Sequence, residues 1–237
     1  SVVDTLAPGL NQLFVKGFEG TAIYHVAGKE FGQIYGGTFQ RNAAGQLVID
    51  DDPSSDTYGY PVYSNKLEVI GNPNPDYILN INNVLTYKNI GISFLWDIKA
   101  GGQMWNGTEG ALVFFGTAKS TENRGEKTVF KGVKASDGTA NNIEVALDEN
   151  WYEGNGGGFG DVAETFIQKT NWVRLREASI FYRLPKSVLD RTPLGDLTVT
   201  LSGRNLLLFT PYNGIDPETS LIGAAEGQGL DYFNMPG

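Results

Sequence analysis

The stretch "LGDLTVTLSGRNLLLFTPYNGIDPE", residues 194–218, decides the fold class. In its first half, an apolar row alternates strictly with a polar row, and a period of two residues indicates a β-strand. The apolar row is Leu197, Val199 and Leu201, and the polar row is Thr198, Thr200, Ser202 and Arg204. Such a strand fits a soluble sheet that hides one face in a core. It equally fits a membrane wall with lipid on one side and water on the other.

The composition favours an all-β chain and argues against some classes of ligand and partner. The 237 residues include 31 Gly, 13 Phe, 11 Tyr and 4 Trp, but no Cys, which excludes disulfides and thiolate metal sites. The formal charge of −9 disfavours nucleic acid, because no run of Lys and Arg could neutralise phosphates. No run of about 20 apolar residues predicts a transmembrane helix, whereas a membrane-spanning β-strand needs only about 9–11 residues.

Residues 76–102 predict a β-hairpin with a tight turn at Lys88 and Asn89. In its first arm, one face carries Tyr77, Leu79, Ile81, Leu85 and Tyr87 and the other carries Asn80, Asn82 and Thr86, with Ile78 and Val84 as exceptions. In its second arm, one face carries Ile90, Ile92, Phe94, Trp96 and Ile98. The opposite face carries Asp97 and Lys99, which would be costly in a small dry core but are comfortable in a wide, wet lumen. An outward row of Ile, Phe and Trp suits lipid.

Residues 173–210 predict a second hairpin. In its first strand, Ala178, Ile180, Tyr182 and Leu184 alternate with Glu177, Ser179 and Arg183, and Phe181 interrupts the polar row. Pro185 ends this strand. The following stretch, 185–196, predicts a turn that contains one helical turn and leads into the strand from Leu197.

The lengths of the connections point to a membrane barrel. The turns inside the two hairpins are short, whereas 1–76 and 101–171 are long segments of a kind that compact soluble domains rarely use. Outer-membrane barrels combine short periplasmic turns with long extracellular loops. We therefore predict the C-terminal part of a large antiparallel transmembrane β-barrel, with extracellular loops concentrated in 1–76 and 101–171. The alternative is a soluble, secreted β-sandwich that binds glycans.

Motifs in the last third of the chain resemble the C-terminal part of SusC/RagA-type TonB-linked outer-membrane receptors. They are "WVRLREASIFYRLPKSVL" (172–189), "LTVTLSGRNLLLFTPYNGIDPE" (197–218) and "GLDYFNMPG" (229–237). Upstream, "GKEFGQIYGGTFQRNAAGQ" (28–46), residues 70–108 and "TENRG" (121–125) are also similar to that family. The resemblance covers most of residues 20–237, and the order and spacing of the motifs make it specific.

The resemblance implies a barrel of about 22 strands with a plug inside. It implies import of large nutrients, an oligosaccharide or a peptide, across the outer membrane of Bacteroidetes-type Gram-negative bacteria. TonB would supply the energy through the N-terminal part, and a SusD-like surface lipoprotein would act as the lid. Residues 1–237 lack the plug domain, the TonB box and the last strand of the family's pattern, so we expect a piece of a longer receptor. Catalysis and cofactors are not expected.

Two sets of residues are candidate contact sites. The candidate contacts for substrate or a partner are Trp105, Trp151, Tyr152, Asp216 and Glu218. The candidate contacts for lipid are Ile92, Phe94, Trp96, Leu197, Val199 and Leu201. The aromatic residues could stack on sugar rings, or pack the loop against itself. Asp216 and Glu218 flank Pro217, and we favour a loop turn in which the carboxylates cap neighbouring amides over a rim that docks a partner.

Four further motifs are weaker. His25 is the only histidine, and we interpret it as a surface or loop residue rather than a zinc ligand. The acidic stretch 50–56 lacks EF-hand spacing, so a solvated turn is favoured over a calcium site. The glycine-rich stretch 154–160 lacks the Lys-Ser/Thr ending of a phosphate loop. Nothing in the sequence positions Asp148 and Glu149 as a glycosidase pair.

Overall fold

In a computed structural model, the chain forms two compact units, which we describe separately. The strand unit consists of Pro75–Gly102 and Thr170–Tyr212, and the loop unit consists of Ser1–Asn74, Gln103–Lys169 and Asn213–Gly237. The structure describes all residues except 156–161, 191, 222–227 and 234–237.

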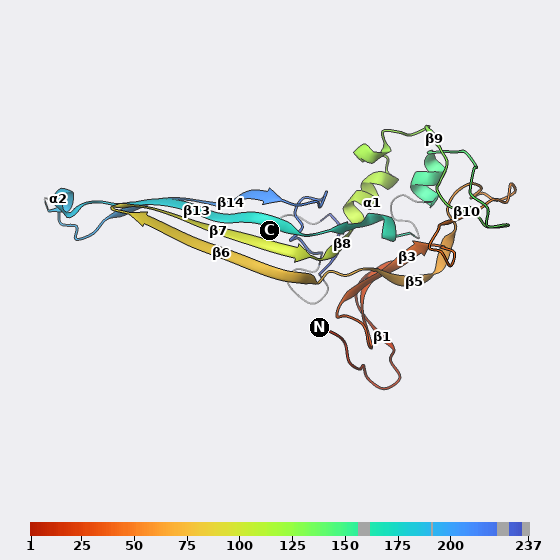
Figure 1. Cartoon of the computed structure of the whole chain (residues 1–237), viewed down its shortest axis with the longest axis horizontal. Coiled ribbons are helices and arrows are strands. Elements are labelled where there is room, and N and C mark those ends of the chain that lie inside the picture. Colours follow the sequence, from red (N-terminus) through yellow and green to blue (C-terminus); the bar gives the residue numbers. More distant parts are fainter. Residues whose placement is uncertain (156–161, 191, 222–227, 234–237) are drawn as a thin grey trace. The chain divides into compact units, whose positions relative to one another are not determined.

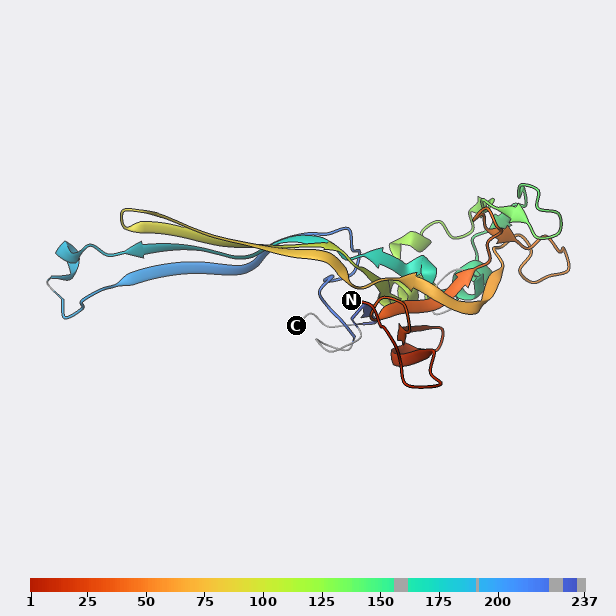
Figure 2. The same cartoon turned by 60° about the horizontal axis from the view of Figure 1, so that its bottom comes forward.

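The strand unit is one antiparallel sheet of four long strands in the order β14-β13-β7-β6 (Figure 1). The strands are β6 (Pro75–Tyr87), β7 (Ile90–Gly101), β13 (Trp172–Arg183) and β14 (Thr198–Phe209). They lie side by side in both views (Figure 2). Both predicted hairpins are confirmed, and the predicted helical turn between β13 and β14 is α2 (Lys186–Leu189).

The two ends of this sheet differ. At one end, Tyr87 pairs with Ile90 across a two-residue turn, and Lys88 adopts a φ of 53°. The α2 turn lies at the same end, because Arg183 pairs with Thr198. At the other end, Pro75 pairs with Gly101 and Trp172 with Lys99. All connections to the loop unit therefore leave the sheet at the end opposite the two short turns.

The strand unit is an open sheet. Among the described residues, β6 and β14 pair on one side only, and the four strands do not close into a barrel. The predicted all-β class is confirmed in its coarse form, since strands predominate and the helices are short.

The loop unit has a sheet and a core of its own, in segments that we expected to be rich in loops. Its main sheet is β1 (Gln12–Phe18), β2 (Thr21–Val26), β3 (Gln33–Phe39) and β5 (Tyr63–Gly71) in that order. A second sheet has the order β12 (Ile167–Lys169), β8 (Gln103–Asn106), β15 (Leu230–Asp231). Two short pairs join β4 (Val48–Ile49) to β10 (Val133–Lys134) and β9 (Lys127–Thr128) to β11 (Val145–Ala146).

Short helical segments complete the loop unit. The stretch 107–127 forms α1 (Gly107–Phe114) and a 3₁₀ turn, Lys119–Thr121. The side chain of Asn106 caps α1, because its Oδ1 accepts a hydrogen bond of 2.9 Å from the Glu109 amide. A π-helical turn covers Asn150–Asn155, and another 3₁₀ turn covers Glu164–Phe166.

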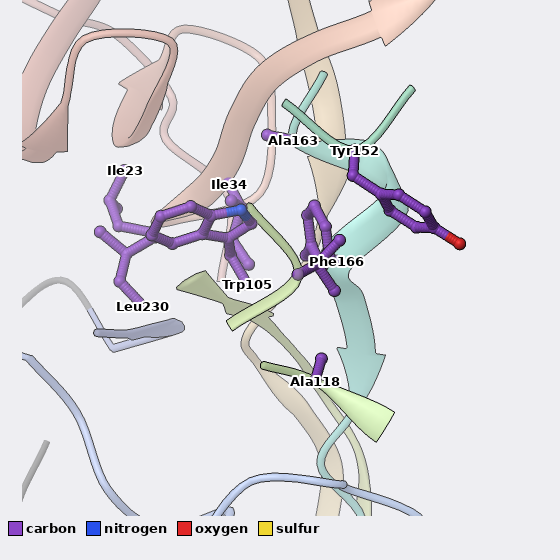
Figure 3. Packing of buried hydrophobic residues seen from close by; sticks show 9 residues of the cluster. Ile23, Ile34, Trp105, Ala118, Tyr152, Ala163, Phe166 and Leu230 are labelled. Carbon is purple, nitrogen blue, oxygen red and sulfur yellow. The ribbon is translucent and has the colours of Figure 1, made fainter. Parts of the chain in front are cut away.

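The core of the loop unit gathers side chains that are far apart in the sequence (Figure 3). Ile23 and Ile34 come from neighbouring strands, Trp105 from β8 and Leu230 from β15, and Ile23, Ile34 and Leu230 have no exposed surface. Phe166 and Tyr152 pack on the same cluster. Burial of apolar surface from these separate segments is what holds the loop unit together.

Candidate functional site

One face of the strand unit is mainly apolar, with Asn83 of β6 as a polar member. Residues directly opposite each other in neighbouring strands point to the same side of a sheet. The register therefore places these side chains together: Tyr77, Leu79, Ile81, Leu85 and Tyr87 of β6; Ile90, Ile92, Phe94, Trp96 and Ile98 of β7; Val173, Leu175, Ala178, Ile180 and Tyr182 of β13; Val199, Leu201, Leu207 and Phe209 of β14. We call this set the apolar face.

The apolar face is exposed. Ile92 is 46% exposed, Val199 59% and Leu201 74%, whereas Phe94 and Trp96 are half-buried by their neighbours. Leu197 lies one residue before β14, where its carbonyl accepts a hydrogen bond from the Leu184 amide. An exposed and mainly apolar surface of this kind marks a site that meets lipid or another apolar surface.

The opposite face, which we call the polar face, carries mainly hydroxyl, amide and charged side chains, with Ile78, Val84, Leu95, Phe181 and Leu208 as apolar exceptions. Its polar members are Asn80, Asn82 and Thr86 of β6; Ser93, Asp97 and Lys99 of β7; Arg174, Glu177 and Ser179 of β13; Thr198, Thr200, Ser202 and Arg204 of β14. The hydroxyls of Ser93 and Ser179 lie 2.5 Å apart. Arg204 lies 3.4 Å from Glu177, and its side chain is 81% exposed, so water also solvates its charge.

A β-bulge creates an ion pair that alternation alone did not predict. The register shifts between Leu175 and Glu177, which turns Arg176 toward the polar face. There its Nε lies 2.7 Å from a carboxylate oxygen of Asp97, a residue that is only 5% exposed. The sequence does carry a signal for this bulge, because the apolar row changes from odd positions up to Leu175 to even positions from Ala178.

Phe181 breaks the polar row for a steric reason. It lies directly opposite Gly91, and its ring fills the space that a Cβ atom on Gly91 would occupy. A glycine in a strand exposes backbone and packs poorly. The aromatic ring of a cross-strand neighbour covers that gap, so this pair is a packing unit within the polar face.

Trp172 is a second residue that sequence reasoning missed. It begins β13 and is 8% exposed. The Lys99 ammonium lies 4.7 Å from the centre of its ring, and the Arg174 guanidinium lies 5.6 Å from it. Lys99 also reaches the hydroxyl of Thr170 at 3.3 Å. Cation–π contacts thus organise the basic residues at the end of the sheet from which the connections leave.

The aromatic residues proposed for substrate contacts have different environments. Trp105 is 5% exposed and packs against Phe18 and Tyr232 in the core. Tyr152 is 7% exposed, and its hydroxyl donates a 2.6 Å hydrogen bond to Asn123. Both rings are therefore packed against other side chains of the loop unit in this structure.

Trp151 is half-buried and belongs to an aromatic cluster. Its ring centre lies 4.4 Å from that of Phe130 and 5.7 Å from that of Tyr60. The Tyr60 hydroxyl lies 3.0 Å from the Ala146 carbonyl and 3.2 Å from Asp148. Burial and the negative charge of Asp148, which also accepts this hydrogen bond, raise the pKa of Tyr60 to about 12.

Asp216 and Glu218 lie in a turn of the predicted kind. The Asp216 carboxylate accepts a 2.9 Å hydrogen bond from the Glu218 amide, and the Asp216 carbonyl accepts one of 2.8 Å from the Thr219 hydroxyl. Pro217 between them is buried. Asp216 therefore shapes this loop through its own backbone contacts, and Glu218 is exposed.

The acidic stretch 50–56 forms a hydrogen-bonded turn. Asp50 accepts bonds from the hydroxyls of Ser55 and Thr57 and from the Asp52 amide, and Asp52 accepts bonds from the amide and hydroxyl of Ser54. The bonds from Ser54 lower the pKa of Asp52. Burial opposes ionisation of Asp50, but the three hydrogen bonds that it accepts outweigh this and lower its pKa. These contacts tie both carboxylates into the turn.

The structure also places the remaining motifs. His25 corrects our interpretation, because it lies in β2, is 8% exposed and stacks on Phe31, with its Nδ1 accepting a 3.2 Å bond from the Gly32 amide. Asp148 and Glu149 are exposed. Of the glycine-rich stretch, residues 156–160 lie outside the described residues. Nowhere in the described part of the chain do three His, Cys, Asp or Glu side chains gather as metal ligands.

Comparison with known proteins gives a consistent result. No protein-family model matches the chain. It is 30% identical over 92% of its length to TonB-dependent receptor P3 of Formosa agariphila, and 27% identical over 81% to TonB-dependent receptor P26 of the same organism. It covers 21% and 17% of these two proteins, so it spans about a fifth of their length.

No helix in the described ranges is both long enough and apolar enough to cross a membrane.

The fold has relatives among solved structures. The RagAB peptide importer in the 'open-open' state matches with a TM-score of 0.57 and 17% identity, over 96% of this chain and 23% of that one. A structure of the RagAB peptide transporter matches with a TM-score of 0.56 and 18% identity, over 97% and 23% of the two chains. At this identity, the likeness concerns the fold.

These matches define the class as TonB-dependent receptors. The sheet with one apolar and one polar face and the separate loop unit agree with that class. The chain is similar to a segment of about a fifth of the length of these receptors, and its fold is similar to part of the RagAB importer.

Proposed function

We propose that the chain forms part of the wall and of the loops of a TonB-energised importer in the outer membrane of a Gram-negative, Bacteroidetes-type bacterium. The observation that carries this proposal is the exposed apolar face backed by a face with charged and hydroxyl side chains, including the ion pair between Arg176 and Asp97. In a soluble β-sandwich, a second sheet would cover such a face. In a barrel wall, lipid covers it and the polar face lines a wet lumen.

The same reasoning assigns the candidate lipid contacts. Ile92, Phe94, Trp96, Val199 and Leu201 belong to the apolar face and would meet lipid chains, with Leu197 at the border near α2. The end of the sheet with the two short turns would lie on the periplasmic side. The loop unit would then lie on the extracellular side, because all its connections leave from the other end.

The partners and the cargo follow from the proposed class. A SusD-like surface lipoprotein would close the extracellular side, and TonB would act through the N-terminal part of the receptor. The cargo would be a large nutrient, a peptide or an oligosaccharide. The RagAB structures are named as a peptide importer and a peptide transporter, which supports a peptide as the cargo. The curated relatives are named as receptors, which supports transport rather than catalysis.

The test is a labelling experiment on whole cells that produce the intact receptor. The chain contains no cysteine, so Ser120→Cys in the loop unit and Ser187→Cys in α2 each add a single thiol to it, and both serines are exposed. An impermeant thiol reagent should label position 120 and not position 187. After lysis, both positions should be labelled, which controls for reactivity.

Labelling of position 187 alone on intact cells would reverse the proposed orientation. Recovery of the protein from the medium without detergent would overturn the membrane assignment and favour the soluble β-sandwich.

A further inference from the structure

A groove of about 450 Å³ lies on the apolar face of the strand unit, over β7, β13 and β14. Ala178 and Gly203 lie directly opposite each other in β13 and β14, and they form its floor because neither carries a bulky side chain. Phe94 lies opposite Ala178 on the β7 side and flanks this floor. The apolar face is thus hollowed at one place by two small residues in register.

The next cross-strand row supplies one wall of the groove. It consists of Ile92, Ile180 and Leu201, which lie opposite one another in the three strands. All three side chains are large and exposed. They therefore stand out from the sheet beside the low floor at Ala178 and Gly203.

A β-bulge in β14 supplies the other wall. Here β14 has two residues, Asn205 and Leu206, where β13 has only Arg176. Asn205 adopts a φ of 50°, a left-handed conformation that Asn tolerates better than most residues. The bulge brings Leu206 beside Gly203, since its Cδ2 atom lies 2.8 Å from the position that a Cβ atom on Gly203 would occupy. The backbone of β14 is thus shaped so that Leu206 borders the groove.

On the apolar face, the described residues that line the groove offer no charge and no hydrogen-bonding side chain. Ser93, Ser179 and Ser202 also line it, but they belong to the polar face, because successive side chains alternate between the two faces of a strand. The hydroxyls of Ser93 and Ser179 lie 2.5 Å apart on that face and contact each other. A polar ligand would lose its hydrogen bonds to water in this groove without replacement.

Hydrocarbon is the chemistry that fits the groove. An apolar cavity of about 150 Å³ already holds benzene, so this groove has room for a longer hydrocarbon segment. Within a bilayer, a lipid chain gains nothing by leaving water, so close packing decides where it stays. A chain in the groove contacts protein atoms on several sides, whereas a chain on a flat wall contacts them on one side, and each added contact contributes dispersion energy. A second protein copy fits less well, because protein interfaces carry about one hydrogen bond per 100–200 Å².

We propose that this groove retains an acyl chain of an outer-membrane lipid, which exchanges more slowly than the lipid along the rest of the apolar face. The chain would lie over Ala178 and Gly203, between Leu206 and the row that contains Ile180. This inference rests on the proposed function, because it places the apolar face in a membrane. It goes beyond that function by assigning one retained lipid to one place on the wall.

Native mass spectrometry of the intact receptor, purified in detergent and depleted of lipid, tests the inference. The probes are a phosphatidylethanolamine with palmitoyl chains and its counterpart with hexanoyl chains, which has the same headgroup. We expect the receptor to retain about one molecule of the long-chain lipid through washing with detergent and to lose the short-chain lipid, because retention depends on the number of packed methylene groups.

Three variants locate the effect. Ala178→Leu fills the floor of the groove and should abolish the retention of this lipid. Leu206→Ala removes a wall at an exposed position, and it should also lose the lipid even if Ala178→Leu fails to insert. Ala100→Leu is the matched control: it makes the same substitution opposite Tyr77 on the apolar face, outside the groove, and should leave the retention unchanged.

Equal retention by wild type, Ala178→Leu and Leu206→Ala would overturn the inference. So would equal retention of the two lipids, which would assign the binding to the headgroup. If Ala178→Leu changed the number of receptor copies in the same spectra, the groove would seat a second copy and the inference would be wrong. Failure of the proposed function is recognised separately, by the labelling pattern at positions 120 and 187 and by recovery of the protein without detergent.

Discussion

At the scale of single residues, Gly91 and Phe181 show how a polar face tolerates an aromatic side chain. The ring occupies the volume that any side chain at position 91 would need. The apparent irregularity of Phe181 in the sequence is therefore half of a pair, and its other half is a glycine on the neighbouring strand.

This pair gives the first prediction. Gly91→Ala should destabilise the protein by about 1–3 kcal/mol, because the new methyl group overlaps the ring. Adding Phe181→Leu should recover part of that loss. The measurement is chemical unfolding of the intact protein in detergent, with the two single variants and the double variant. Additive effects would show that the two residues do not share the same space.

Tyr60 gives a prediction about pH. Its pKa rises from 10.0 to about 12 in the folded protein, through burial and Asp148. A raised pKa means that the neutral phenol stabilises the fold. This contribution is complete below about pH 10 and is lost as the pH rises toward about 12. Tyr60→Phe should therefore flatten the stability of the protein against pH in that window.

The comparison of wild type with Tyr60→Phe isolates this residue from the other tyrosines. Stability is measured by unfolding at several pH values, and tyrosinate formation by ultraviolet absorbance. A variant whose stability falls as steeply as wild type between about pH 10 and 12 would contradict the assigned cause.

At the scale of the element, alternate residues of β7 lie on the apolar face and on the polar face of the sheet. Phe94 pairs with Ala178 and Asn83 on the apolar face, and Leu95 pairs with Asn82 on the polar face. Phe94 and Asn82 thus lie at nearly the same height in the sheet but on opposite sides. They form a matched pair for testing which solvent each face meets.

We expect Phe94→Arg to destabilise the inserted protein by about 2–4 kcal/mol if the residue lies near the membrane midplane. Asn82→Arg should be mild, because a wet lumen can solvate the guanidinium. Both are measured by reversible unfolding from detergent or vesicles. Equal tolerance at the two positions would remove the basis for a lipid-facing side.

At the scale of the whole molecule, the open edges of the strand unit matter most. In the described part of the chain, β6 and β14 each have one paired side and one unpaired side. Unpaired amides and carbonyls cannot be satisfied in lipid, and exposed edges promote association. The neighbouring strands of a barrel would have to come from elsewhere in a longer receptor.

The 237 residues expressed alone should therefore aggregate or fail to insert as a monomer. The measurement is electrophoresis of unheated and heated samples in detergent, with circular dichroism. A compact, monomeric and heat-modifiable β-protein would contradict this expectation.

The strand unit was predictable because its information is local. Alternation of apolar and polar residues specifies a strand and its two faces, so the row from Leu197 to Leu201, the turn at Lys88 and the helical turn after Pro185 could be read in sequence order. Even the bulge at Arg176 leaves a mark, since the apolar row changes parity there. What alternation does not contain is the partner of a charged residue, such as Asp97 for Arg176.

The loop unit could only be decided by tertiary structure. Its short strands bury side chains such as Ile34, Trp105 and Leu230, which the sequence separates widely. No local period predicts that Trp105 turns into a core while the adjacent Asn106 lines a pocket beside Asp231. The sequence by itself determined the two-faced sheet, because a strand's faces depend on neighbours two residues away. The tertiary structure decided the core and the pocket, because burial depends on segments that meet only when the whole unit has folded.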